Sequence, residues 1–212
     1  MTTKKRMIRT FLLALVGLGI GAFIAWVQVQ EEQGQTSGQS QPESRSVAGI
    51  ALEPGFSLTD HTGAAVTEAD YTGQYKLIYF GFTYCPAICP TELQKISRVL
   101  EQLDEAQAEK IQPLFITIDP ERDTVDVMRE YVDLFHPRLI GLTGSVEEIE
   151  QVKSGYKVFA AKVPTEDGSD YTMDHSSFIY LMGPENRTLG IYRMQDDAEM
   201  MRNDIAQILT RS

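Results

Sequence analysis

The sequence predicts a three-layer α/β fold, in which helices cover the faces of a buried sheet. Two apolar runs rich in β-forming residues, 76–82 and 113–118, have the character of buried central strands. Each run is followed by apolar residues at helical spacing, which predicts that strands and helices alternate along the chain.

The first elements expected in the folded part are a hairpin, a strand and a helix. Residues 56–58 and 65–67 lie on either side of the turn-forming stretch 60–63, so we expect two paired strands there. The buried strand 76–82 precedes a helix whose apolar positions are Leu93, Ile96, Val99, Leu100 and Leu103.

The second buried strand, 113–118, is followed in the prediction by two helices. The helix expected at 124–135 has an inward face formed by Val127, Met128, Tyr131, Leu134 and Phe135. Ser145 and Glu148 have the spacing of a capping box, which predicts that a helix begins there and stops at Gly155.

The C-terminal part is expected to hold two strands and one helix. Strands at 178–182 and 189–194 are separated by a turn at 183–186, and an amphipathic helix begins at about Asp197. Alternating strands and helices that are followed by a hairpin and a helix are typical of the thioredoxin type of sandwich.

Composition and charge exclude several classes of protein. The chain has 212 residues, a net charge of −11 and two cysteines. Two cysteines are too few for a disulfide-rich scaffold or for a four-cysteine zinc site. The acidic balance argues against a nucleic-acid partner, which would need clustered Lys and Arg side chains.

An uncharged segment at residues 10–30 predicts a transmembrane anchor. A helix of this length spans about 30 Å, the thickness of the hydrocarbon core of a bilayer. A buried core helix would show a polar stripe, and this segment has none before Gln28. The tail 1–9 holds four basic residues and two acidic residues follow the segment, so the positive-inside rule places the tail in the cytoplasm.

The rest of the chain is then expected on the other side of the membrane, which for a bacterial inner membrane is the periplasm. A cleaved signal peptide is the alternative, but the stretch 22–30 lacks the pair of small residues that cleavage requires. Residues 31–48 are rich in Gln, Glu, Ser and Gly and predict a flexible linker. The folded domain is expected at 49–212.

Cys85 and Cys89 lie between a buried strand and a helix, where ligand sites of open α/β sheets occur. Pro90 suits the first helical position and Cys89 the position before it, so free N–H groups and the helix dipole favour thiolates. A structural disulfide here would close a very small loop and stabilise little. Inert buried thiols are unusual outside the cytoplasm. We therefore expect redox or metal chemistry.

Soft thiolate and imidazole ligands suit copper or zinc, so a histidine is the expected third ligand. The chain has three histidines. His61 lies in a predicted solvated turn and His136 follows a helix, so both are expected to be structural. His175 precedes a predicted strand, and sequence spacing alone does not bring it to the cysteines.

Several sequence blocks together resemble those of the Sco (SenC) family of copper chaperones for cytochrome c oxidase. The blocks lie at residues 81–93, 119–123, 140–144 and 174–176. The resemblance implies a thioredoxin-like fold. It also implies one copper ion per chain, Cu(I) or Cu(II), bound by Cys85, Cys89 and His175.

The resemblance further implies partners. Copper would pass to the CuA domain of cytochrome c oxidase subunit II, and a thioredoxin-like reductant or another copper chaperone would serve the cysteines. No sequence feature indicates catalytic turnover, so the chain is not expected to be an enzyme. The alternative is a thiol–disulfide oxidoreductase that keeps the cysteines of that subunit reduced. Such enzymes of this fold usually have two residues between their cysteines, whereas this chain has three. A peroxidase would need an arginine beside its cysteine, and Arg122 is the candidate.

Three features near the expected ligands leave alternatives open. Family members commonly carry Asp directly after the first proline of the cysteine motif, whereas this chain has Ala87. Loss of that carboxylate is expected to make the thiols more acidic. In one interpretation Asp119 ends a strand and Asp123 or Thr124 caps the next helix; in the other, Asp119 and Asp123 act beside the copper site. Met173 is either a packing residue or an additional soft ligand.

Overall fold

The computed structural model describes residues 52–168 and 170–211. The predicted tail 1–9, anchor 10–30 and linker 31–48 lie outside these residues and stay predictions. In the described part of the chain, no helix combines the length and the apolar character needed to cross a membrane.

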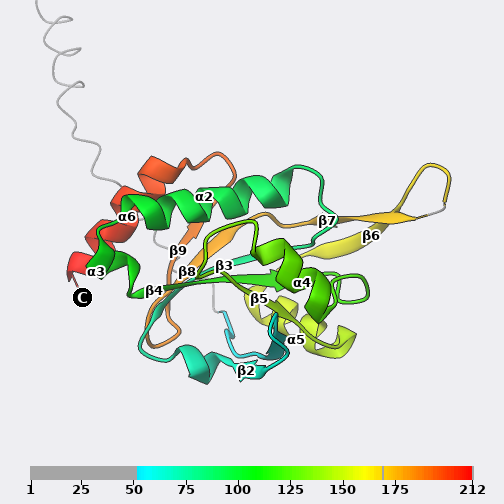
Figure 1. The fold of residues 1–212 in the computed structure, drawn as a ribbon, viewed down its shortest axis with the longest axis horizontal. Coiled ribbons are helices and arrows are strands. Elements are labelled where there is room, and N and C mark those ends of the chain that lie inside the picture. The colour runs from blue at the N-terminus through cyan, green and yellow to red at the C-terminus, as the bar shows by residue number, and fades with distance from the viewer. Residues whose placement is uncertain (1–51, 169, 212) are drawn as a thin grey trace, which may run out of the picture. The chain divides into compact units, whose positions relative to one another are not determined.

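A mixed sheet forms the centre of the described domain (Figure 1). Its strands are β1 (Ser57–Asp60), β2 (Ala65–Thr67), β3 (Tyr75–Gly81), β4 (Ile111–Thr117), β5 (Ile140–Thr143), β8 (Ile179–Met182) and β9 (Thr188–Tyr192). They lie in the order β2-β1-β5-β4-β3-β8-β9, and β3, β4 and β5 are parallel. Every residue of β3 and β4 is buried, which confirms them as the central strands.

Helices cover both faces of this sheet. They are η1 (Glu68–Tyr71), α2 (Ile88–Gln102), α3 (Glu105–Ala108), α4 (Val125–Val132), α5 (Val146–Tyr156) and α6 (Ala198–Arg211). Successive side chains of a strand point to opposite faces. On one face Tyr79 packs with Phe115, which contacts Tyr131 of α4. On the other face Phe80 packs with Tyr156 of α5. The helices α2 and α6 lie side by side (Figure 1), and the result is the predicted three-layer sandwich.

A second, two-stranded sheet was not expected from the sequence. It pairs β6 (Ala160–Pro164) with β7 (Tyr171–His175), and Figure 1 shows it extending from the edge of the domain. In the described residues these two strands pair with each other and with no strand of the main sheet. No residue of either strand is fully buried. Because the hairpin contributes little to the core, it lacks the apolar periodicity that predicts strands.

Two helices differ from their predicted positions. Helix α2 begins at Ile88, so Cys89 lies inside its first turn rather than before it. Helix α4 ends at Val132, and the predicted inward residue Leu134 is 75% exposed. Val132, which is 2% exposed, takes its place in the core. The prediction continued the helical periodicity past the point where the helix ends.

The capping box of α5 is confirmed, but its end is set differently from the prediction. Ser145 accepts a hydrogen bond from the N–H of Glu148, and the Glu148 carboxylate accepts one from the N–H of Ser145. The left-handed residue that ends the helix is Lys157, with φ of 57°. Gly155 is needed for another reason, since a Cβ there would lie 2.3 Å from the carbonyl oxygen of Glu53.

Candidate metal centre

The two cysteines lie at the carboxyl end of β3. Cys85 is in the loop that follows this strand, and Cys89 is in the first turn of α2. Cys89 is fully buried and Cys85 is 9% exposed. Gly81 makes this packing possible, because a Cβ at that position would lie 2.8 Å from the sulfur of Cys89. The last residue of the strand therefore has to be glycine for the helix to approach so closely.

The start of α2 is capped by a cysteine sulfur. Ala87 occupies the N-cap position and has no side chain that accepts a hydrogen bond. The N–H of Cys89 instead donates to the sulfur of Cys85 at 3.3 Å. An unpaired N–H at a helix N-terminus stabilises negative charge, so this contact favours the thiolate of Cys85.

The structure brings His175 to the cysteines, although it follows Cys89 by 86 residues. His175 is the last residue of β7, and its Nε2 atom lies 3.6 Å from the sulfur of Cys89. Its Nδ1 atom lies 3.0 Å from the carbonyl oxygen of Ser176. A carbonyl oxygen only accepts hydrogen bonds, so this contact requires the proton on Nδ1. In the neutral ring, Nε2 then offers its lone pair toward the sulfur, as a metal ligand does.

Aromatic side chains hold this group in place. The rings of Tyr79 and Phe82 meet the imidazole of His175 edge to face, with centroids 6.3 and 5.9 Å away. The hydroxyl of Tyr79 also donates to the sulfur of Cys89 at 3.6 Å. Tyr79 was not predicted as a site residue, because nothing in a buried β-strand marks one tyrosine as a neighbour of a distant cysteine.

The two cysteines differ in acidity, whereas the position at the helix start was expected to favour the thiolate form. The pKa of Cys85 is lowered to about 3, chiefly by the hydrogen bond from the Cys89 thiol, with further contributions from backbone N–H groups. The pKa of Cys89 is raised by the same interaction and by burial. Near neutral pH the pair therefore holds one thiolate and one thiol.

The Cys89–His175 contact has the dimensions of one edge of a metal site. Metal–sulfur and metal–nitrogen bonds of about 2.3 and 2.0 Å, at an angle of about 110–120°, separate the two donor atoms by about 3.5–3.7 Å. The observed separation is 3.6 Å. In the described residues no three His, Cys, Asp or Glu side chains are already gathered into a complete metal cage. This edge is formed, and Cys85, whose sulfur accepts the N–H of Cys89 at 3.3 Å, is the remaining candidate ligand.

The other two histidines do not contact the cysteines. Nδ1 of His61 accepts the N–H of Gly141 at 3.3 Å, which ties the β1–β2 turn to β5. Nδ1 of His136 accepts the N–H of Arg138 at 3.2 Å, and burial lowers the pKa of its ring. Both have the structural roles expected of them, although His61 is half-buried rather than solvated. Met173 lines a separate cavity beside β4 and α5.

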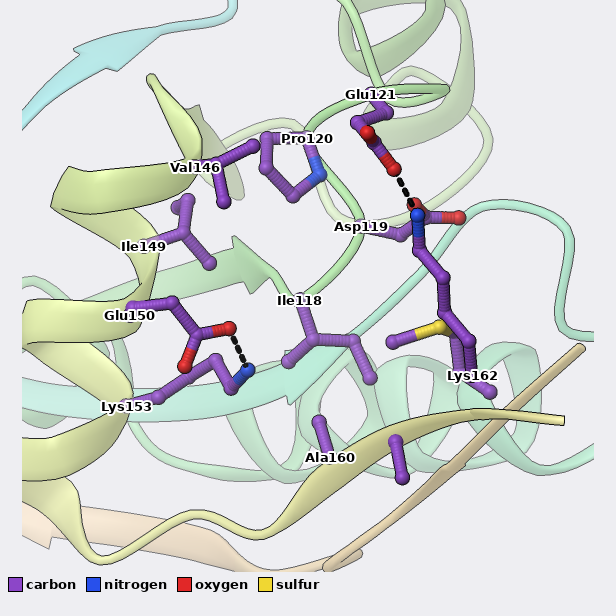
Figure 2. Close-up of a pocket in the computed structure, with 12 residues that line it drawn as sticks. Ile118, Asp119, Pro120, Glu121, Val146, Ile149, Glu150, Lys153, Ala160 and Lys162 are labelled. Carbon is purple, nitrogen blue, oxygen red and sulfur yellow. Dashed lines mark hydrogen bonds and ion pairs between the residues drawn. The ribbon is translucent and has the colours of Figure 1, made fainter.

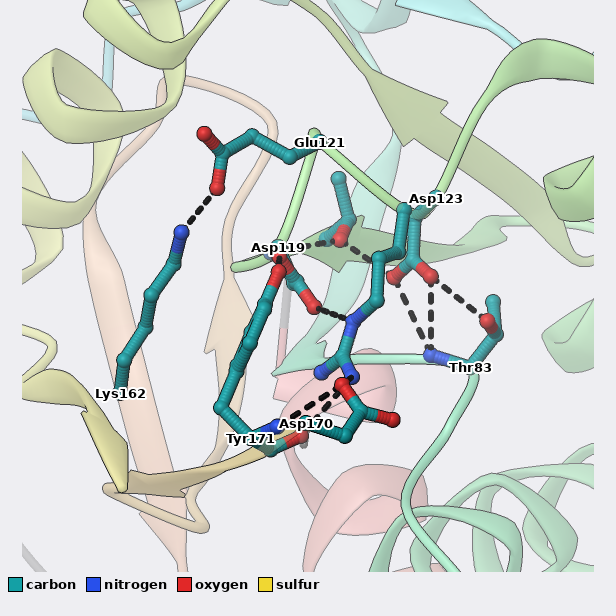
Figure 3. Close-up of polar contacts among 9 residues, drawn as sticks. Thr83, Asp119, Glu121, Asp123, Lys162, Asp170 and Tyr171 are labelled. Atoms are coloured by element: carbon teal, nitrogen blue, oxygen red, sulfur yellow. Dashed lines mark hydrogen bonds and ion pairs between the residues drawn. The ribbon is translucent and has the colours of Figure 1, made fainter. Parts of the chain in front are cut away.

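The loop after β4 forms a polar cluster that includes Thr83, two residues before Cys85 (Figure 3). Of the two candidate caps of α4, Thr124 is the one that acts, since its hydroxyl accepts the N–H of Val127. Asp123 instead accepts hydrogen bonds from Thr83 and Thr117. The Nε and Nη1 atoms of Arg122 bind partners within this cluster, chiefly Asp119, rather than a cysteine. This placement does not support the peroxidase alternative.

Comparison with known proteins gives consistent matches over most of the chain. The SCO1/SenC family model matches residues 45–210. The mitochondrial SCO2 homolog of Bos taurus is 44% identical over 198 residues, which cover 93% of this chain and 73% of that protein. The human mitochondrial SCO1 homolog is 46% identical over 138 residues, covering 65% of this chain and 46% of that protein.

Solved structures with copper bound share the fold. Arabidopsis thaliana ScoI with copper bound has a TM-score of 0.72 and 41% identity, and the match covers 77% of this chain and 100% of that chain. Bradyrhizobium japonicum ScoI with copper bound has a TM-score of 0.68 and 43% identity, covering 74% and 99% of the two chains. The described domain therefore has the thioredoxin-like fold of these proteins.

Proposed function

Because this chain belongs to the SCO1/SenC family, we propose that it is a copper chaperone that acts in the assembly of cytochrome c oxidase. The observation that carries the proposal is the contact between Cys89 and His175, which joins two distant segments at a distance that fits a shared metal ion. The copper bound to the Arabidopsis and Bradyrhizobium relatives supports the same conclusion. Copper is here the cargo of the protein.

We assign one copper ion per chain to Cys85, Cys89 and His175. Cys85 supplies a thiolate that already exists at neutral pH, and His175 supplies Nε2. The thiol of Cys89, whose pKa is raised, has to release its proton when it binds the metal. Three protein ligands leave one side of the ion open, so an incoming ligand from a client can replace them one at a time.

We propose that the client is the CuA site of cytochrome c oxidase subunit II. Loading requires both cysteines to be reduced, since a disulfide does not provide two thiolates. When the cysteines form a disulfide, a dithiol reductant of the thioredoxin type restores both thiols here and becomes a disulfide itself. Copper loading is therefore coupled to the thiol redox state of the chain.

We also propose that residues 10–30 anchor the chain in a membrane and that residues 31–48 link the anchor to the copper domain. A tethered domain stays close to a membrane-bound client, which raises its effective concentration. With a basic tail in the cytoplasm, the copper domain would lie on the opposite side, which is the periplasm for a bacterial inner membrane.

Thiol–disulfide exchange is a second candidate function, and the pKa of Cys85 favours it. A thiolate at neutral pH is reactive, and a low pKa also makes Cys85 a good leaving group in a mixed disulfide. Thiol–disulfide exchange requires no metal, so it gives His175 no necessary role.

One comparison separates the two functions. The reduced full chain, purified in detergent, is loaded with copper and then mixed with a metal-free CuA domain whose cysteines are reduced. A chaperone transfers about one copper per chain, and His175→Ala abolishes the transfer whereas His136→Ala preserves it. A reductase transfers no copper and reduces an oxidised CuA domain equally well with and without His175. That second outcome would contradict the chaperone proposal.

A further inference from the structure

Apart from the ring contacts of His175 and the partial packing of Ala160 and Met173 against the core, the hairpin that carries His175 is attached to the domain through polar contacts. Its strands β6 and β7 pair only with each other in the described part of the chain. A cavity of about 210 Å³ separates it from α5 and from the end of β4, and Figure 2 shows Ala160 and Lys162 across this space from Ile149 and Lys153. On this side the hairpin therefore lacks the close apolar packing that fixes a strand of the main sheet.

Arg122, in the loop after β4, makes several polar contacts to this hairpin. Its Nη1 atom donates to the carbonyl oxygen of Tyr171 at 2.8 Å and to Asp170 at 3.2 Å. Its guanidinium lies 3.7 Å from the centre of the Tyr171 ring. Its Nε atom donates to the fully buried carboxylate of Asp119 at 2.6 Å. That carboxylate also accepts the hydroxyl of Tyr171 at 2.8 Å, so the hairpin is fixed to both members of the ion pair.

The same loop also holds the segment that carries the cysteines. Asp123 accepts hydrogen bonds from the N–H and the hydroxyl of Thr83, two residues before Cys85 (Figure 3). The guanidinium of Arg122 lies 4.8 Å from the ring centre of Tyr84, which is the residue next to Cys85. Arg122 is therefore in contact with both chain segments that carry the expected ligands.

We propose that Arg122 is a positioning residue for copper binding, which sets the separation between His175 and the cysteines by joining Tyr171 to Tyr84 through its guanidinium. The inference rests on the proposed function, because it concerns the same copper site. Residues that orient metal ligands without touching the metal typically contribute 10–100-fold to metal affinity. Lysine is not expected to replace this arginine. It lacks the planar guanidinium, which stacks on a tyrosine ring and at the same time donates hydrogen bonds from its edge.

The second cation on the hairpin has a lesser role. Lys162 pairs with Glu121 and lies 4.5 Å from the ring centre of Tyr171, but both members of that pair are about half exposed. Exposed ion pairs of this kind stabilise little. The effect on copper binding is therefore expected from Arg122 rather than from Lys162.

The test compares Arg122→Lys and Tyr171→Phe with the control Arg129→Met in the full chain. Arg129 forms an exposed pair with Asp126 on α4, and in the described residues its side chain has no hydrogen bond or ion pair with the hairpin. Tyr171→Phe removes only the hydroxyl that binds Asp119, so it keeps the fold even if the arginine variant does not. The readouts are Cu(II) affinity, the nitrogen hyperfine coupling from histidine in electron paramagnetic resonance, and amide hydrogen exchange of residues 160–175 without metal.

Arg122→Lys is expected to lower Cu(II) affinity by about 10–100-fold and to weaken the nitrogen coupling. Hydrogen exchange of 160–175 is expected to rise in both variants while β3 and β4 stay protected, and Arg129→Met is expected to match the wild type. The inference would be overturned if the variants lost thermal stability but kept the wild-type Cu(II) affinity, nitrogen hyperfine coupling and hydrogen exchange of residues 160–175. If the wild-type chain binds no copper, the proposed function fails, and the exchange measurement still decides whether Arg122 positions the hairpin.

Discussion

Ala87→Asp is expected to raise the pKa of Cys85, because the residue at position 87 competes with this sulfur for one N–H group. An aspartate at the N-cap of α2 would accept from the backbone N–H at the second or third helical position. The third position is Pro90, which has no N–H, so the remaining donor is the N–H of Cys89. That N–H is the one that donates to Cys85 at 3.3 Å.

Two contributions set the size of this effect. Loss of a hydrogen bond to a charged sulfur costs about 1.5 kcal/mol, which corresponds to about one pKa unit. A new carboxylate at roughly 6 Å adds about 0.7 kcal/mol of repulsion in water, or about half a unit. The pKa of Cys85 is lowered to about 3 in this chain. We therefore expect it to lie at about 4.5 in Ala87→Asp.

The assay follows thiolate absorbance in the ultraviolet or the rate of alkylation as a function of pH, on the reduced full chain. Ala87→Asn is the matched control, since it competes for the N–H of Cys89 without adding charge, and it is expected to raise the pKa of Cys85 by the smaller amount. An unchanged or lower pKa in Ala87→Asp would refute the reasoning, because neither competition nor repulsion would then act on the sulfur.

Three further predictions concern the same centre. Gly81→Ala places a Cβ 2.8 Å from the sulfur of Cys89. It is expected to lower the free energy of unfolding, measured with denaturant, by about 1–3 kcal/mol and to reduce copper binding. A wild-type free energy of unfolding together with wild-type copper affinity would contradict the packing described. Tyr79→Phe removes the O–H group that donates to the sulfur of Cys89. The thiolate-to-copper absorption band is therefore expected to shift, while the free energy of unfolding changes by about 1 kcal/mol. An unshifted band would exclude this hydrogen bond in the copper-loaded site. Copper binding displaces the proton of Cys89 but none from Cys85. The apparent association constant for copper is therefore expected to rise about tenfold per pH unit between about pH 7 and 8. An association constant that does not change with pH would show that both thiols are already ionised.

Sequence patterns predicted the parts of the fold that are set by local interactions or by burial. The central strands β3 and β4 are continuous apolar runs, and such runs are the direct signature of strands buried on both faces. The start of α5 was predicted because Ser145 and Glu148 satisfy each other's backbone within four residues. The beginning of α2 was missed because its cap is the sulfur of Cys85, a residue that no capping rule includes.

The candidate site depends on contacts that sequence spacing does not contain. Cys85 and Cys89 stand out by their spacing, but His175 reaches them on a hairpin whose strands are at most partly buried and which Arg122 contacts at Tyr171. Its selection from three histidines rested on the resemblance to a family. The difference in acidity between the two cysteines likewise follows from which sulfur receives the N–H at the helix start and which is fully buried.

The most direct test of the copper site is X-ray absorption spectroscopy of the full chain loaded with one equivalent of Cu(I), in the native and His175→Ala forms. We expect two sulfur ligands and one nitrogen ligand per copper in the native chain, with the nitrogen lost in His175→Ala. Two sulfur ligands with no nitrogen, unchanged by the substitution, would contradict the role of His175 and leave a dithiol site like that of a thiol–disulfide oxidoreductase.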